Sequence, residues 1–171
     1  KLTLIKEGTG TLTLTNSSTY TGDLYVRGGQ VTVPTGVTID GMRRVDVAGT
    51  SGATLDISGT VETGLGGDFG VGAGVAGTGE VIVKTGGTLS IGRLPTSGDL
   101  NGAVYIGGKF SNTGGSGVGT LIIDGGTVTV GGAGRVISGY DASAIWFNGW
   151  AGGSTVSSIS IQNGGVLETA R

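Results

Sequence analysis

A short phrase made of two β-like runs joined by Gly-Gly occurs three times in this chain. The copies begin at Val81, Leu121 and Ile159 and read VIVKTGGTLSI, LIIDGGTVTV and ISIQNGGVL. The starts lie 40 and then 38 residues apart (121 − 81 and 159 − 121). A repeated unit that cannot bury its own apolar face alone is typical of a stacked, solenoid-like fold.

Strand signals dominate the rest of the chain. Triplets with two apolar residues around a third residue recur throughout, and the period of two puts both apolar side chains on one face of a strand. The central residue is usually Thr, Ser, Asp or Tyr, so we expect the other face to meet water. Examples are Leu12-Thr13-Leu14, Val45-Asp46-Val47, Leu55-Asp56-Ile57, Leu89-Ser90-Ile91 and Val128-Thr129-Val130. We find no long stretch with helical periodicity.

The short strands and the 40 glycines among 171 residues favour a parallel β-helix, with glycine at its corners. A β-sandwich is the alternative. We expect one domain over residues 1–171, with coils in 1–60 and repeats of about 40 residues in 77–171. At about 20 residues and ~4.8 Å per coil, each repeat would form two coils and the chain a rod of roughly 35–40 Å.

Composition excludes several classes of function. Ten basic and twelve acidic residues give a net charge of −2, which disfavours nucleic-acid binding. No apolar run approaches the ~18 residues of a membrane-spanning helix, so we expect no membrane insertion by this segment. The chain contains neither cysteine nor histidine, which removes thiolate chemistry, the commonest general base and the commonest metal ligand. We therefore expect no cofactor and no metal.

The N-terminal segment carries the most specific pattern in the chain. Residues 6–31 read KEGTGTLTLTNSSTYTGDLYVRGGQV. This closely resembles the autotransporter-associated β-strand repeat, also called the passenger-associated transport repeat. The matching residues are Lys6, Gly8, Gly10, Leu12, Leu14, Thr19, Tyr20, Thr21, Gly22, Gly29 and Val31. Ser18 stands where the family usually has Asn, and Asp23 where Gly is common.

This resemblance implies a right-handed parallel β-helix, export across the cell envelope and an extracellular or bacterial cell-surface location. It implies no catalytic residues. We therefore expect a non-enzymatic structural or adhesive β-helix, serving as a stalk, an adhesin segment or a fibre subunit. The alternative is a β-helix that binds or cleaves carbohydrate.

Two groups of residues are candidates for a site. The densest charged cluster comprises Asp40, Arg43, Arg44 and Asp46, which could perform acid–base chemistry on a polysaccharide or form ion pairs at a solvated corner. The second group is aromatic and could contact a glycan or a protein partner, or fill the core. It consists of Tyr140, Trp146, Phe147 and Trp150.

The ends of a β-helix expose strand edges that pair readily with other strands. The sequence shows no capping helix near either end. We therefore expect either head-to-tail stacking of copies of this chain or a place within a longer passenger. The expected partners are the chain itself or another surface protein, and glycans.

Overall fold

The computed structural model describes residues 1–73, 76–92, 102–108, 117–131, 143–149 and 156–169. These residues form strands joined by turns, and the strands pair in parallel within two sheets. The strands are β1 (Leu4–Lys6), β2 (Thr11–Thr13), β3 (Ser18–Thr19), β4 (Asp23–Val26), β5 (Gly29–Val33), β6 (Thr38–Val47), β7 (Ala53–Ile57), β8 (Thr60–Val71), β9 (Thr78–Lys84), β10 (Thr88–Ile91), β11 (Gly102–Gly108), β12 (Val118–Asp124), β13 (Thr127–Val130), β14 (Ser143–Gly149), β15 (Ser158–Gln162) and β16 (Val166–Thr169).

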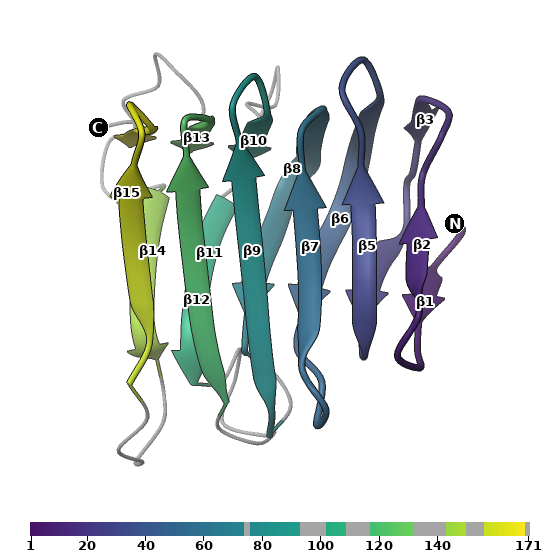
Figure 1. Ribbon diagram of the computed structural model, residues 1–171. Helices are drawn as coiled ribbons and strands as arrows, with labels where there is room; N and C mark the ends of the chain where they lie inside the picture. The colour runs from purple at the N-terminus through teal and green to yellow at the C-terminus, as the bar shows by residue number, and fades with distance from the viewer. Residues whose placement is uncertain (74–75, 93–101, 109–116, 132–142, 150–155, 170–171) are drawn as a thin grey trace.

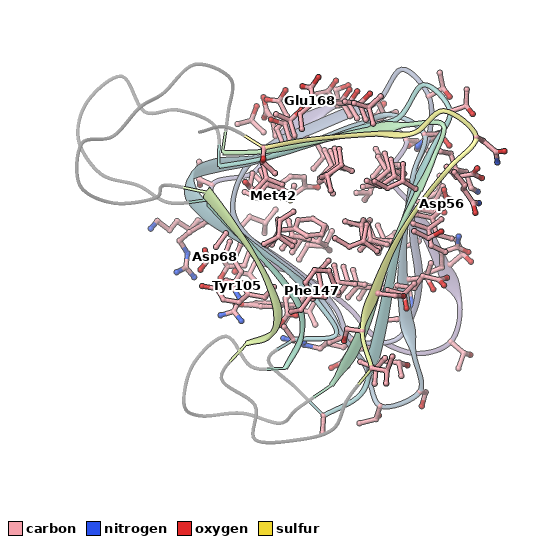
Figure 2. All side chains as sticks on the ribbon, turned by 90° about the vertical axis from the view of Figure 1, so that its left-hand side faces the viewer. Met42, Asp56, Asp68, Tyr105, Phe147 and Glu168 are labelled. Atoms are coloured by element: carbon pink, nitrogen blue, oxygen red, sulfur yellow. The ribbon has the colours of Figure 1, made fainter. Side chains whose placement is uncertain are left out.

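The strands enclose the core in three walls, which give a triangular cross-section (Figure 2). The first wall contains β1, β4, the second halves of β6 and β8, β11 and β14. The second wall is the six-stranded sheet of β2, β5, β7, β9, β12 and β15, at the front of Figure 1. The third wall contains β3, the first halves of β6 and β8, β10, β13 and β16.

The predicted parallel β-helix is therefore confirmed. Six coils are stacked, as the six strands of the second wall show. Seen from the C-terminal end, the chain runs anticlockwise from β14 through β15 to β16 while it advances toward the viewer, so the solenoid is right-handed (Figure 2). Five steps of ~4.8 Å give an axial length of about 24 Å.

The predicted division of the 40-residue repeat into two coils is wrong. Val81 of β9 pairs directly with Leu121 of β12, which pairs in turn with Ile159 of β15. Each 40-residue phrase is thus one coil. The first coils are much shorter, because Leu12 pairs with Val31 only 19 residues later (31 − 12). The solenoid is correspondingly shorter than the rod expected from the sequence.

Two strands are longer than the predicted triplets because they turn a corner without a break. β6 continues from the third wall into the first, with register shifts between Ile39 and Arg44. Gly41 stands at this corner with φ +76°, in the left-handed region that glycine adopts without strain. The triplets Val37–Ile39 and Val45–Val47 consequently belong to two walls of one coil.

The interior is a stack of aliphatic side chains, as the alternation of apolar and polar residues predicts. One column on the first wall runs through Leu24, Val45, Phe69, Val104 and Ile145. The middle three are fully buried. Fully burying one such side chain stabilises the fold by about 1.5–3 kcal/mol. Figure 2 shows the same inward direction for Met42, whereas Asp56, Asp68, Tyr105 and Glu168 lie outside the walls.

Glycine is required where the first wall ends and the second begins. A Cβ atom on Gly79 would lie 1.8 Å from the carbonyl oxygen of Val47, in the coil below. One coil further, a Cβ on Gly119 would lie 2.0 Å from the oxygen of Val71. The backbones approach closely at this corner in successive coils, so only glycine fits.

Candidate functional site

The predicted charged cluster is divided between two walls. Asp40 lies in the first half of β6, on the third wall, whereas Arg44 and Asp46 lie on the first wall. Arg43 pairs with Asp23 of the preceding coil at 2.5 Å rather than with Asp40. The structure therefore does not bring Asp40 and Asp46 together as a pair of carboxylates.

Asp46 is the centre of an ion-pair network on the outer face of the first wall. Its carboxylate accepts a hydrogen bond from Arg27 at 2.9 Å, and the guanidinium of Arg44 lies 3.7 Å away. Only 1% of the Asp46 side chain is exposed, since these two arginines cover it. Burial raises the pKa of Asp46 above its ordinary value, and the charges of Arg27 and Arg44 oppose this shift.

The network extends along the wall through two tyrosines. The Tyr25 hydroxyl donates to Asp23 at 3.0 Å, and the Arg27 guanidinium lies 4.8 Å from the Tyr25 ring centre. Further along the axis, Asp68 and Tyr105 lie next to each other on the same outer face (Figure 2). Burial raises the pKa of both groups, and the charge of Asp68 raises the pKa of Tyr105 further.

This network resembles a structural ion-pair cluster more than a binding site. Arg27 and Arg43 are each paired with a buried carboxylate, and Arg44 lies beside Asp46. Because the charges neutralise one another within the wall, a charged ligand would have to break existing ion pairs before binding. The predicted ion pairs at this corner are present, although with different partners from those close in sequence.

The four predicted aromatic residues are only partly described. Tyr140 and Trp150 lie outside the described residues, and Trp146 is placed only by its backbone, paired with Tyr105. Phe147 pairs with the buried Ile106 and points inward in the last coil, where half of it is exposed (Figure 2). Its exposure comes from the position of this coil at the end of the stack.

A hollow of about 280 Å³ opens on the outer face of the second wall. It lies over the beginnings of β7, β9 and β12, which are adjacent in Figure 1. Three side chains are aligned across successive coils, because Thr54 pairs with Glu80 and Glu80 pairs with Thr120. Thr78 also lines the hollow. Neighbouring coils lie ~4.8 Å apart, so these polar groups converge on one small volume.

The polar side chains of the hollow are unoccupied by the protein itself. Thr54, Thr78, Glu80 and Thr120 have no side-chain hydrogen-bond partner among the residues that the structure describes. Lys84, in contrast, contacts Asp56 at 2.5 Å on the same wall. The hollow thus offers one carboxylate and three hydroxyl groups to a ligand.

The sequence analysis did not identify this hollow. A signal was present, because Thr78-Gly79-Glu80 and Val118-Gly119-Thr120 stand at equivalent places directly before two copies of the repeated phrase. Aligning the copies as single coils would have placed Glu80 beside Thr120. The expectation of two coils per repeat separated them.

Other features of the described residues give no further candidate. A cavity between the first coils, lined by Leu4, Leu24 and Met42 among others, holds about 10 Å³, room for about one water molecule. Within the described ranges, no three side chains are grouped as metal ligands. No helix in this part of the chain is long and apolar enough to cross a membrane.

Comparison with known proteins gave one match. Residues 4–33 match the passenger-associated-transport-repeat family, which confirms the resemblance seen in the sequence. The matched segment contains β1 to β5, which form the first coil and part of the second. The comparisons with curated proteins and with solved structures gave no match. The repeat indicates an autotransporter passenger at the cell surface.

Proposed function

We propose that this chain is a non-enzymatic section of an extracellular passenger, working as a rigid stalk at the bacterial surface. One observation carries the proposal: the passenger repeat at residues 4–33 continues into the same three walls as the rest of the described chain. A solenoid of this kind has mechanical continuity along its axis, because each coil is bonded to the next by parallel ladders on three sides.

The energetics of the walls support a structural role. Inward positions such as Val31, Leu55, Val81 and Leu121 form an almost fully buried column through four coils of the second wall. The outward neighbours are mostly threonine, serine and charged residues that tolerate water. Stability in such a stack is the sum of each coil and its interfaces, so length can increase without a larger core.

The non-enzymatic part of the proposal is supported by the ion pairs of the first wall. A pair of acid–base carboxylates needs two free groups at a defined separation. Asp46 is covered by Arg27 and Arg44, and Asp23 is held by Arg43 and Tyr25. These carboxylates are thus engaged in holding the wall together.

Cell-surface labelling tests the location. Intact bacteria that produce the protein are stained with an antibody raised against residues 1–171, before and after permeabilisation. We expect equal labelling in both states, together with loss of the signal when intact cells are treated with protease. Labelling that requires permeabilisation would contradict the proposal.

We also propose that end coils of this chain associate head to tail. In the last coil, the inward-facing Phe147 and Ile161 are 50% and 51% exposed, because no further coil covers them. Such a contact does not close on itself and would produce fibres. Electron microscopy with light scattering of the isolated chain tests this, and single particles of monomer mass would exclude it.

A further inference from the structure

The hollow on the second wall differs from the other polar surfaces of the solenoid in being unoccupied. On the first wall, the charged groups are bonded to one another, so their hydrogen-bonding capacity is consumed. In the hollow, Glu80 and the three threonine hydroxyls have no such bonds within the described structure. A small concave surface with a few convergent, free polar groups is the usual form of a ligand site.

The charges of the lining restrict the ligand. Glu80 is the single charged residue of the eight that line the hollow, so an anion would be repelled. One carboxylate with threonine hydroxyls is a poor site for a divalent cation, because Ca²⁺ takes six to eight oxygen ligands, with several carboxylates in strong sites. The remaining class is a neutral ligand that carries several hydroxyl groups.

The hydrogen-bonding groups suit a sugar ring. A carboxylate accepts hydrogen bonds only, and its two oxygens can receive two adjacent hydroxyl groups of one ring. The hydroxyls of Thr54, Thr78 and Thr120 can donate as well as accept, so they can bond to the remaining ring oxygens. The volume of about 280 Å³ lies just below the roughly 300–1,000 Å³ of drug-sized ligand sites, which indicates one sugar unit.

Neighbouring residues supply the apolar side of such a site. Ile82 and Ile122 lie two residues beyond Glu80 and Thr120, so they share the outer face of β9 and β12. They pair with each other and are half-buried. The floor of the hollow includes Gly52 and Gly79, whose missing side chains leave space above the backbone.

We propose that the hollow formed by Thr54, Thr78, Glu80 and Thr120 binds a single sugar unit of a neutral glycan. Glu80 receives two hydroxyl groups of the sugar, the threonines bond to the others, and the two isoleucines contact its C–H groups. This adds a recognition site to one wall of the solenoid. It is independent of the stalk role, so either proposal can fail without the other.

Saturation-transfer NMR tests this with the 171-residue chain and glucose, galactose, mannose and N-acetylglucosamine as probes, followed by affinity measurement for any sugar that binds. Glu80→Gln keeps the shape but removes the charge that accepts both hydroxyls. We expect it to weaken binding by about tenfold or more, because hydrogen bonds to charged groups contribute about 1.5–3 kcal/mol. Thr120→Val should weaken binding by roughly three- to tenfold.

The matched control is Thr32→Val, on the same wall but outside the hollow, which should leave the affinity unchanged. Valine is well tolerated in strands, so these variants should fold, and far-UV circular dichroism checks this. Thr120→Phe fills the hollow and should abolish binding. The proposal is overturned if none of the four sugars binds, or if the affinity is the same in the wild type, Glu80→Gln and Thr120→Phe.

Discussion

Replacing Gly79 by alanine is the sharpest test of how the corner between the first and second walls is built. The new Cβ would lie 1.8 Å from the carbonyl oxygen of Val47 and 2.5 Å from the backbone nitrogen of Gly72. These two atoms are hydrogen-bonded to each other at 2.8 Å. The added methyl group would therefore enter the ladder between donor and acceptor.

The cost follows from two terms. Real Cβ contacts do not fall below 3.0 Å, so the oxygen would have to move by 1.2 Å (3.0 − 1.8). Overpacking of this kind costs about 1–3 kcal/mol, and leaving a buried donor and acceptor unpaired costs about 1–3 kcal/mol more. Together they predict a loss of about 2–6 kcal/mol, a large part of the roughly 5–15 kcal/mol that stabilises a typical protein.

Urea unfolding followed by far-UV circular dichroism measures this loss. The matched control is Gly10→Ala, because a Cβ on Gly10 meets no atom within 4 Å. We expect the control to change the free energy of unfolding by less than about 0.5 kcal/mol. A Gly79→Ala protein as stable as Gly10→Ala would refute the close approach of the two coils.

Three further predictions concern the core and the ion pairs. Phe69→Ala should lower the free energy of unfolding by about 3–5 kcal/mol, whereas Thr88→Ala on an outer face should change it by less than about 0.5 kcal/mol; urea unfolding measures both. Arg27→Ala should be strongly destabilising in the same assay, because it removes the nearest partner of the buried Asp46. Since burial raises the pKa of Asp46 above 3.8, the folded state binds this proton first, and stability should rise as the pH falls from above the raised pKa toward 3.8. Asp46→Asn should flatten that rise in urea unfolding at several pH values, and an unchanged slope would contradict the assignment.

Part of the architecture could be predicted because it is written in local patterns. In Leu89-Ser90-Ile91 the two apolar residues are buried and the serine is half-exposed, as a period of two requires. The sequence of residues 6–31 was specific enough to indicate a passenger repeat. Both signals depend on neighbours within about ten residues or on one contiguous motif.

Features that depend on stacking could not be predicted in the same way. The number of residues between walls is not fixed by the walls themselves, so 19 residues separate Leu12 from Val31 and 40 separate Val81 from Leu121, although each pair is one coil apart. Register between coils decides which outward residues meet. For this reason Asp46 was expected near Asp40 but lies beside Arg27, and the meeting of Glu80 with Thr120 was not foreseen.

The unequal coils have a consequence for how such a chain can be edited. Because Val81 and Leu121 occupy equivalent places in adjacent coils, joining Glu80 directly to Leu121 would remove residues 81–120 and leave every remaining strand on its own wall. The register of the second wall thus marks natural excision points. A chain built in this way can gain or lose whole coils by recombination while its neighbours keep the same contacts, which makes its length a heritable variable separate from its fold.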